Sequence, residues 1–149
     1  MEKNYSIRPL RAEDFATLIE WWQYYDHMEV PDSGLLPNGG LGGFIVEKDG
    51  KRISAAFLYL TNSDIGYVDY LVSDPHYKNR DRYEMITDLI AACSQEALLS
   101  GCRMTWAMTS FKGVVKRCDD LGYEVLDDNY KVIYTHQKAY KDIVEQNKN

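Results

Sequence analysis

The sequence predicts one α/β domain of the α+β kind, in which a mixed, mostly antiparallel sheet of about seven strands is flanked by helices. Its 149 residues suffice for one sizeable core and are too few for two. Short segments with alternating apolar residues, typical of strands, stand beside longer ones in which apolar residues recur every three or four positions, typical of helices. The domain is expected to span residues 1–136, with the polar residues 137–149 forming a tail outside it.

The first part of the domain is expected to contain a strand, a helix and a long loop. A strand at residues 5–8 stops at Pro9, which lacks the N–H group that a strand interior needs. Apolar side chains recur at helical spacing in residues 12–25. Residues 26–43 contain two prolines and five glycines without a consistent period, so a loop of a length typical of functional segments is expected there.

Three strands are expected next, at residues 44–47, 53–60 and 66–72. Asp49-Gly50 lies between the first two and favours a tight hairpin turn, because these residues adopt the positive φ angles that such a turn needs. The third strand alternates throughout, which predicts that one face carries Tyr67, Asp69 and Leu71 and the other Val68, Tyr70 and Val72.

The C-terminal half of the domain is expected to contain a long helix, a strand, a short helix and two final strands. The long helix covers residues 80–99, and its apolar stripe consists of Met85, Ile86, Leu89, Ile90, Cys93 and Ala97. A strand at residues 103–109 follows, then a short helix capped by Ser110. The final strands are expected at residues 123–126 and 131–134.

Composition narrows the classes of partner and compartment. A net charge of −6 disfavours nucleic acid, whose binding usually depends on a basic stripe. No apolar stretch approaches the roughly 20 residues of a membrane span, and the first residues do not read as a secretory signal, so a cytoplasmic protein without membrane contact is expected. Three cysteines within apolar segments suit reduced core thiols, and three scattered histidines give no support for a metal site.

Three segments carry a resemblance to a known family. Residues 5–9 read Tyr-Ser-Ile-Arg-Pro and precede an early acidic pair, residues 70–78 read Tyr-Leu-Val-Ser-Asp-Pro-His-Tyr-Lys, and residues 116–123 end in Leu-Gly-Tyr. With the order of expected elements, these segments resemble the GCN5-related N-acetyltransferase (GNAT) superfamily. A looser similarity to acetyltransferase-like proteins of tailed phages covers residues 36–37, 57–63 and 73–75.

This resemblance implies a GNAT fold with a binding site for acetyl coenzyme A (acetyl-CoA). In the family, the fourth and fifth strands splay, here near Leu71 and Ala107, and the pantetheine arm pairs with exposed strand backbone, which implies cofactor contacts for Leu71 and Val72. The strand-helix-strand crossover predicts that these two strands run parallel.

The pyrophosphate of the cofactor is expected at the start of the long helix, where N–H groups and the helix dipole bind anions. The residues that match the family's phosphate-binding motif are Lys78, Asn79, Arg80, Asp81, Arg82 and Tyr83. Asp81 and Tyr83 stand where the family has glycine, a departure that puts cofactor binding in question. The structural alternative is that Asn79 or Asp81 caps the helix and the arginines form a solvated face.

The resemblance also indicates two catalytic candidates. Asp69 is the acid in the strand that often carries the general base, and the alternative is a structural acid paired with an arginine or a tyrosine hydroxyl. Cys118 stands where many members have the tyrosine that protonates the thiolate of coenzyme A, and the alternative is a buried structural cysteine.

The acceptor is expected beside the long loop, where Trp22, Tyr25 and His27 suit an aromatic pocket. The alternative places Trp22 in the core, Tyr25 over the loop and His27 on the surface. Two functions follow: an acetyl-CoA-dependent N-acetyltransferase acting on a primary amine of a small molecule, peptide or protein, or a catalytically inactive relative that binds a protein partner. A homodimer is compatible with both.

Overall fold

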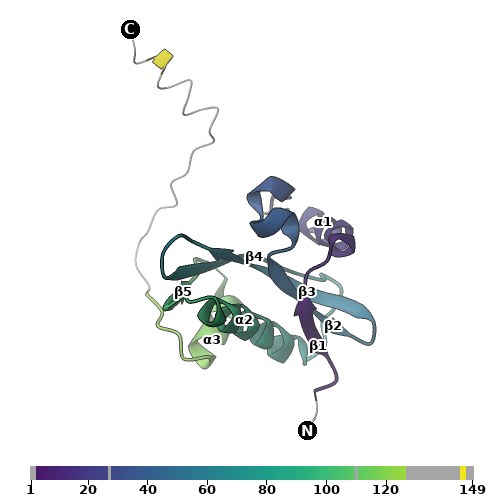
Figure 1. The fold of residues 1–149 in the computed structure, drawn as a ribbon. Helices are drawn as coiled ribbons and strands as arrows, with labels where there is room; N and C mark the ends of the chain where they lie inside the picture. Colours follow the sequence, from purple (N-terminus) through teal and green to yellow (C-terminus); the bar gives the residue numbers. More distant parts are fainter. Residues whose placement is uncertain (1–2, 27, 110, 127–144, 147–149) are drawn as a thin grey trace.

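A mixed β-sheet forms the middle layer of the molecule, and helices cover both of its faces (Figure 1). The computed structural model describes residues 3–26, 28–109, 111–126 and 145–146. The five strands of this part lie in the order of the sequence: β1 (Ser6–Pro9), β2 (Gly43–Lys48), β3 (Lys51–Leu60), β4 (Ile65–Ser73) and β5 (Met104–Trp106). Pairs from β1 to β4 are antiparallel, whereas β5 runs parallel to β4.

Helix α1 (Phe15–Tyr24) covers one face of the sheet, and α2 (Arg82–Leu99) and α3 (Lys112–Asp120) cover the other (Figure 1). A short 3-10 turn, η1 (Ala12–Asp14), leads into α1. The long loop after α1 contains two further turns, η2 (Ser33–Leu35) and η3 (Pro37–Gly40).

The expected helices and the first strands are confirmed, but the expectation of seven strands is not. Residues 123–126 form no strand; Gly122 ends α3 at a φ of 85°, and Val125 and Leu126 beyond it are exposed, without a described strand to pair with. The strand expected at residues 103–109 shortens to Met104–Trp106. The strand at 131–134, the domain boundary at 136 and Ser110 lie outside the described residues, and α3 begins after Phe111.

A bulge in β4 changes which side chains share a face. Val72 pairs with Ala55 and Asp69 pairs with Phe57, so β4 has one residue more than β3 between these pairs. Tyr70 accommodates the extra residue with a φ of 53°, in the left-handed region. The predicted alternation is therefore wrong beyond Asp69.

The two hydrophobic clusters show the result of this bulge. Val68 and Leu71 pack in the cluster beneath α2, although strict alternation placed them on opposite faces. Tyr70 and Val72 pack in the cluster beneath α1. The predicted stripe of α2 is confirmed, since its buried residues are Met85, Ile86, Leu89, Ile90, Cys93 and Ala97.

An ionic cluster lies beside β1, the edge strand of the sheet. Asp14 is fully buried, and its carboxylate accepts two hydrogen bonds from Arg8 at 2.8 Å, one from Arg52 at 2.8 Å and one from the Arg11 amide at 2.8 Å. Burial alone would raise the pKa of Asp14, but the hydrogen bonds from Arg8 and Arg52 hold it well below its usual range. Glu47 binds the same Arg8 guanidinium, with 2.8 Å to Nε.

None of the described helices is long and apolar enough to cross a membrane. The described histidine, cysteine and acidic side chains form no cluster of three that would hold a metal ion.

Candidate active site

A cavity of about 640 Å³ lies where β4 and β5 stop pairing. The two strands pair in parallel only from Ile65 with Met104 to Tyr67 with Trp106. Beyond this point β4 continues to Ser73, and residues 107–109 leave the sheet and line the cavity from the other side. The cavity therefore passes through the sheet, at the divergence expected near Leu71.

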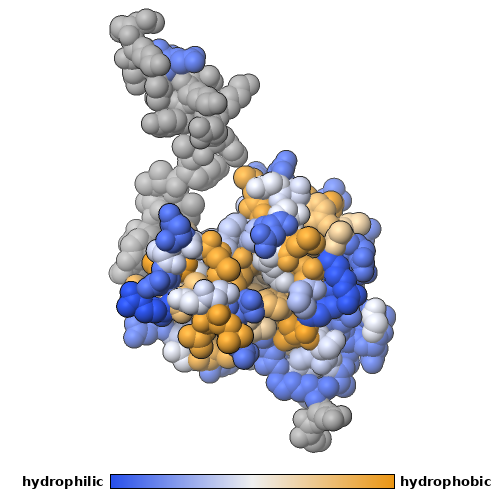
Figure 2. Space-filling view, in the orientation of Figure 1, coloured by the Kyte–Doolittle hydropathy of each residue, from blue (hydrophilic) through white to orange (hydrophobic). Residues whose placement is uncertain are grey.

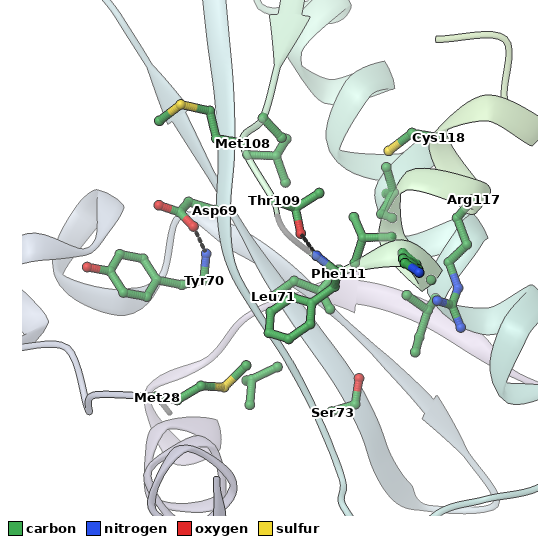
Figure 3. Close-up of a pocket in the computed structure, with 18 of the residues that line it drawn as sticks. Met28, Asp69, Tyr70, Leu71, Ser73, Met108, Thr109, Phe111, Arg117 and Cys118 are labelled. Carbon is green, nitrogen blue, oxygen red and sulfur yellow. Dashed lines mark hydrogen bonds between the residues drawn. The ribbon is translucent and has the colours of Figure 1, made fainter. Parts of the chain in front are cut away.

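On the α1 side, the cavity is lined by aromatic and acidic residues. Trp22 and Tyr25 come from α1 and its end, and Glu29 comes from the long loop. Asp69 and Tyr70 come from the bulge of β4 (Figure 3).

Asp69 is oriented by two hydrogen bonds. The Tyr67 hydroxyl donates to its Oδ2 at 3.0 Å, and the Tyr70 amide donates to its Oδ1 at 2.7 Å. Burial, followed by the charge of Asp69, raises the pKa of Tyr67 to about 12, so the phenol keeps its proton and remains a donor. Asp69 thus has the tyrosine hydroxyl partner expected of a structural acid. Its carboxylate also lines the cavity, as a catalytic base would.

On the α2–α3 side, the cavity is lined by cations and proton donors. Arg82 comes from the first turn of α2, and Lys112 and Arg117 come from α3. Cys118 and Tyr123 lie beside them, and burial raises the pKa of both, that of Tyr123 to about 12. Both therefore carry a proton at neutral pH. Tyr123 also forms a hydrogen bond with Ser94 Oγ.

Of the residues expected to contact the cofactor, only those of β4 and one of the pyrophosphate motif are in the cavity. Leu71, Val72 and Arg82 line it, whereas the neighbouring residues do not. These neighbours are Lys78, Asn79, Arg80, Asp81 and Tyr83. The first three are exposed, in agreement with the alternative of a solvated face.

The two residues that replace glycine are held by other contacts. Asp81 accepts a hydrogen bond from the Tyr77 hydroxyl at 2.8 Å and forms an ion pair with Lys48. It stands at the N-cap position of α2 without a side-chain capping bond, so the capping alternative is wrong for Asp81. The ring of Tyr83 lies 4.9 Å from Lys116 Nζ and 4.5 Å from the Arg117 guanidinium.

The two catalytic candidates lie on opposite sides of the cavity. Asp69 projects from β4 on the α1 side, and Cys118 projects from α3 on the opposite side of the cavity (Figure 3). Cys118 is half-buried, whereas Cys93 and Cys102 are buried in the core as expected.

Of the three acceptor candidates, the structure brings two to the cavity. Trp22 both packs in the core, with 1% of its surface exposed, and lines the cavity, so the two interpretations of this residue are compatible. Tyr25 lines the cavity, and its hydroxyl donates to the Ser73 carbonyl at 3.3 Å. His27 lies outside the described residues.

The sequence did not single out several residues that line the cavity or orient its side chains: Glu29, Tyr67, Trp106, Arg117 and Tyr123. Only Tyr123 carried a signal, because it follows the Leu-Gly motif that closes α3. Glu29 comes from a loop and Trp106 from a strand end, whereas Tyr67 lies within β4 and Arg117 within α3; the proximity of all four to the cavity depends on the tertiary fold.

Comparisons with known proteins agree with this architecture. No protein-family model matches the chain, and no curated protein matches it. Among solved structures, the ribosomal-protein-S18-alanine N-acetyltransferase of Escherichia coli has a TM-score of 0.63 at 17% identity, over 79% of this chain and 76% of that one. An aminoglycoside acetyltransferase from a soil metagenome, in complex with sisomicin, has a TM-score of 0.62 at 14% identity, over 90% and 97%.

A third structure, the N-acetylglutamate synthase of Neisseria gonorrhoeae with coenzyme A and L-arginine, has a TM-score of 0.66 at 19% identity. The match covers 94% of this chain and 32% of that longer one. At these identities the likeness concerns the fold. The chain thus has the α+β fold of the N-acetyltransferases.

Proposed function

We propose that this protein is an acetyl-CoA-dependent N-acetyltransferase that acts on a primary amine. The observation that carries the proposal is the cavity through the sheet, whose carboxylates line the α1 side and whose cations line the α2–α3 side. An anionic acyl donor and a cationic acceptor would each meet opposite charge and approach from opposite faces. The structural neighbours include N-acetyltransferases of a protein and of an aminoglycoside.

The residues of the α2–α3 side suit a phosphorylated donor. Arg82, Lys112 and Arg117 supply three positive charges to the cavity, and the helix dipole at the start of α2, where Arg82 lies, adds to them. The Asp81 carboxylate does not oppose this arrangement, because it pairs with Lys48 and does not line the cavity. The replacement of glycine by Asp81 therefore does not cancel the positive charge on this side of the cavity, which remains favourable for a polyanion.

Acetyl-CoA would supply a thioester whose carbonyl carbon accepts the amine. In the proposed reaction, Asp69 takes a proton from the amine, the nitrogen forms the C–N bond, and the C–S bond breaks. Tyr67 and the Tyr70 amide hold the carboxylate in place for this transfer. The leaving sulfur then needs a proton, for which the Cys118 thiol and the Tyr123 hydroxyl are the donors that line the α3 side.

Calorimetric titration of the purified protein with coenzyme A tests the first step. We expect binding that weakens as salt is added, since the cations contribute by charge. Arg117→Met should weaken it more than Arg103→Met, because Arg103 is exposed and pairs with Asp64 away from the cavity. Mass spectrometry of an amine incubated with acetyl-CoA and protein tests the transfer itself. A protein that does not bind coenzyme A at low salt would refute the proposal.

A second candidate function is a catalytically inactive protein that binds a partner, including a second copy. Exposed apolar side chains favour it: Met104, Trp106, Met108 and Phe111 follow one another along β5 and the start of α3. Figure 2 shows hydrophobic side chains over the end of the molecule where β5, α2 and α3 lie. Light scattering at increasing concentration tests the homodimer, which Trp106→Ser should weaken.

A further inference from the structure

Among the described residues, the charged groups on the α1 side of the cavity are carboxylates. Asp69 and Glu29 are its charged groups, whereas Arg82, Lys112 and Arg117, the cations that line the cavity, all come from α2 and α3. Within the described part of the chain, neither carboxylate forms an ion pair with lysine or arginine. A ligand on this side therefore meets two carboxylates whose charge remains available.

Tyr70 links the two carboxylates into one binding region. The bulge turns its side chain to the same face as Asp69, and its amide donates to Asp69 at 2.7 Å. Burial raises the pKa of Tyr70, and the charges of Asp69 and Glu29 raise it further, which shows that both act on this phenol. Because Glu29, Asp69 and Tyr70 all line the same cavity, a ligand that fills its α1 side can contact both acids.

Aromatic rings surround the same region. Tyr70 packs edge to face against Trp22, with 6.4 Å between ring centroids, and Tyr67 lies 5.5 Å from Trp106. Trp22, Tyr70 and Trp106 all line the cavity. Ring faces attract ammonium groups and their methylene neighbours alike.

We infer that the acceptor is a small diamine, which places its reacting amino group beside Asp69 and a second, protonated nitrogen at Glu29 among the aromatic rings. The inference rests on the proposed transferase function and names its acceptor. Two positive charges offset two carboxylates, whereas an acceptor with its own carboxylate is repelled by both. A single amine, such as a lysine side chain, leaves Glu29 without a counter-charge.

Three amines of similar length test the inference: butane-1,4-diamine, n-butylamine, which has the shape of a lysine side chain, and 4-aminobutanoate. With acetyl-CoA saturating and the product measured by mass spectrometry, we expect kcat/KM for the diamine to exceed that for n-butylamine by about tenfold or more. The aminobutanoate should be poorest. Added salt should reduce the advantage of the diamine.

Glu29→Gln should reduce the ratio of kcat/KM between diamine and n-butylamine toward one. Glu20→Gln is the matched control, since it removes one exposed charge from α1 without touching the cavity, and it should keep the ratio. An equal preference for n-butylamine, or a ratio that both variants change alike, would overturn the inference.

Direct calorimetry separates this inference from the proposed function. The diamine is titrated into the protein alone, and coenzyme A is titrated separately. Coenzyme A binding without preference for the diamine rejects the diamine and leaves the transferase. Diamine binding that Glu29→Gln weakens about tenfold, without coenzyme A binding, supports the acidic site and rejects the transferase. If neither ligand binds, both proposals fail.

Discussion

Removal of the buried charge at Asp14 should destabilise the protein more than other conservative carboxylate replacements. Asp14→Asn keeps the size of the side chain but replaces one oxygen, which accepts hydrogen bonds from Arg8 and from either Arg52 or the Arg11 amide, with an amide group that donates them. Removal of one partner from a buried ion pair costs about 3–5 kcal/mol, because the remaining charges lose their compensation. For a chain of this size, such a loss lowers Tm by roughly 6–20 °C.

Urea or thermal unfolding at neutral pH measures this change. Glu13→Gln is the matched control, because Glu13 is exposed and lies 3.8 Å from Arg11, a surface pair worth less than about 1 kcal/mol. An Asp14→Asn protein within about 1 kcal/mol of the parent would refute the reasoning.

The pH dependence gives a second measurement. Because the pKa of Asp14 is lower in the folded chain than the value of about 3.9 expected when unfolded, the unfolded chain takes up the proton first as pH falls. The stabilisation is complete above about pH 5 and is lost as the pH falls below about 4. Asp14→Asn should lack this component, so the difference in stability between parent and variant should shrink in acid. A constant difference would contradict the assignment of the effect to this carboxylate.

Three further predictions concern the cavity. Asp69→Asn should lower the acetylation rate at neutral pH by roughly 100-fold with a smaller effect on stability, and an unchanged pH–rate profile would exclude Asp69 as the base. Lys48→Met leaves Asp81 without its counter-charge and should weaken coenzyme A binding about fivefold at low salt, whereas an equal effect at high salt would exclude a charge mechanism. Since burial raises the pKa of Cys118, iodoacetamide should alkylate its thiol more slowly than free cysteine, and bound coenzyme A should slow the alkylation further. Peptide mapping measures the alkylation of this residue. An alkylation rate that coenzyme A leaves unchanged would place the thiol outside the site.

Periodic features were predictable from the sequence because a regular element repeats the same environment. The buried stripe of α2 follows from helical spacing alone, and the Asp49-Gly50 turn follows from residues that adopt positive φ, which both do, at 52° and 75°. The crossover between β4 and β5 required the parallel pairing that the structure has.

The bulge and the contacts that it creates were not predictable in this way. The alternating pattern in the sequence of β4 shows no break at Tyr70. Only the pairing with β3 shows that β4 has one extra residue there. The bulge brings both Asp69 and Tyr70 to the cavity side that Glu29 also lines, and this depends on the tertiary fold. The sequence identified Asp69 and Cys118 as catalytic candidates. For the same reason, it did not predict that they line one cavity from opposite sides.

The bulge at Tyr70 also determines how β4 tolerates substitution. Before it, Gly66 and Val68 face α2, and a Cβ at Gly66 would already lie 3.2 Å from Ala97 Cβ. After it, the residue that faces α2 is Leu71, three positions beyond Val68 instead of two or four. A saturation scan of β4 should therefore show a two-residue rhythm of sensitivity that shifts its phase at Tyr70. Deletion of Tyr70 would restore the regular strand, keep Leu71 on the face of α2 and Val72 on that of α1, and remove the ring beside Asp69.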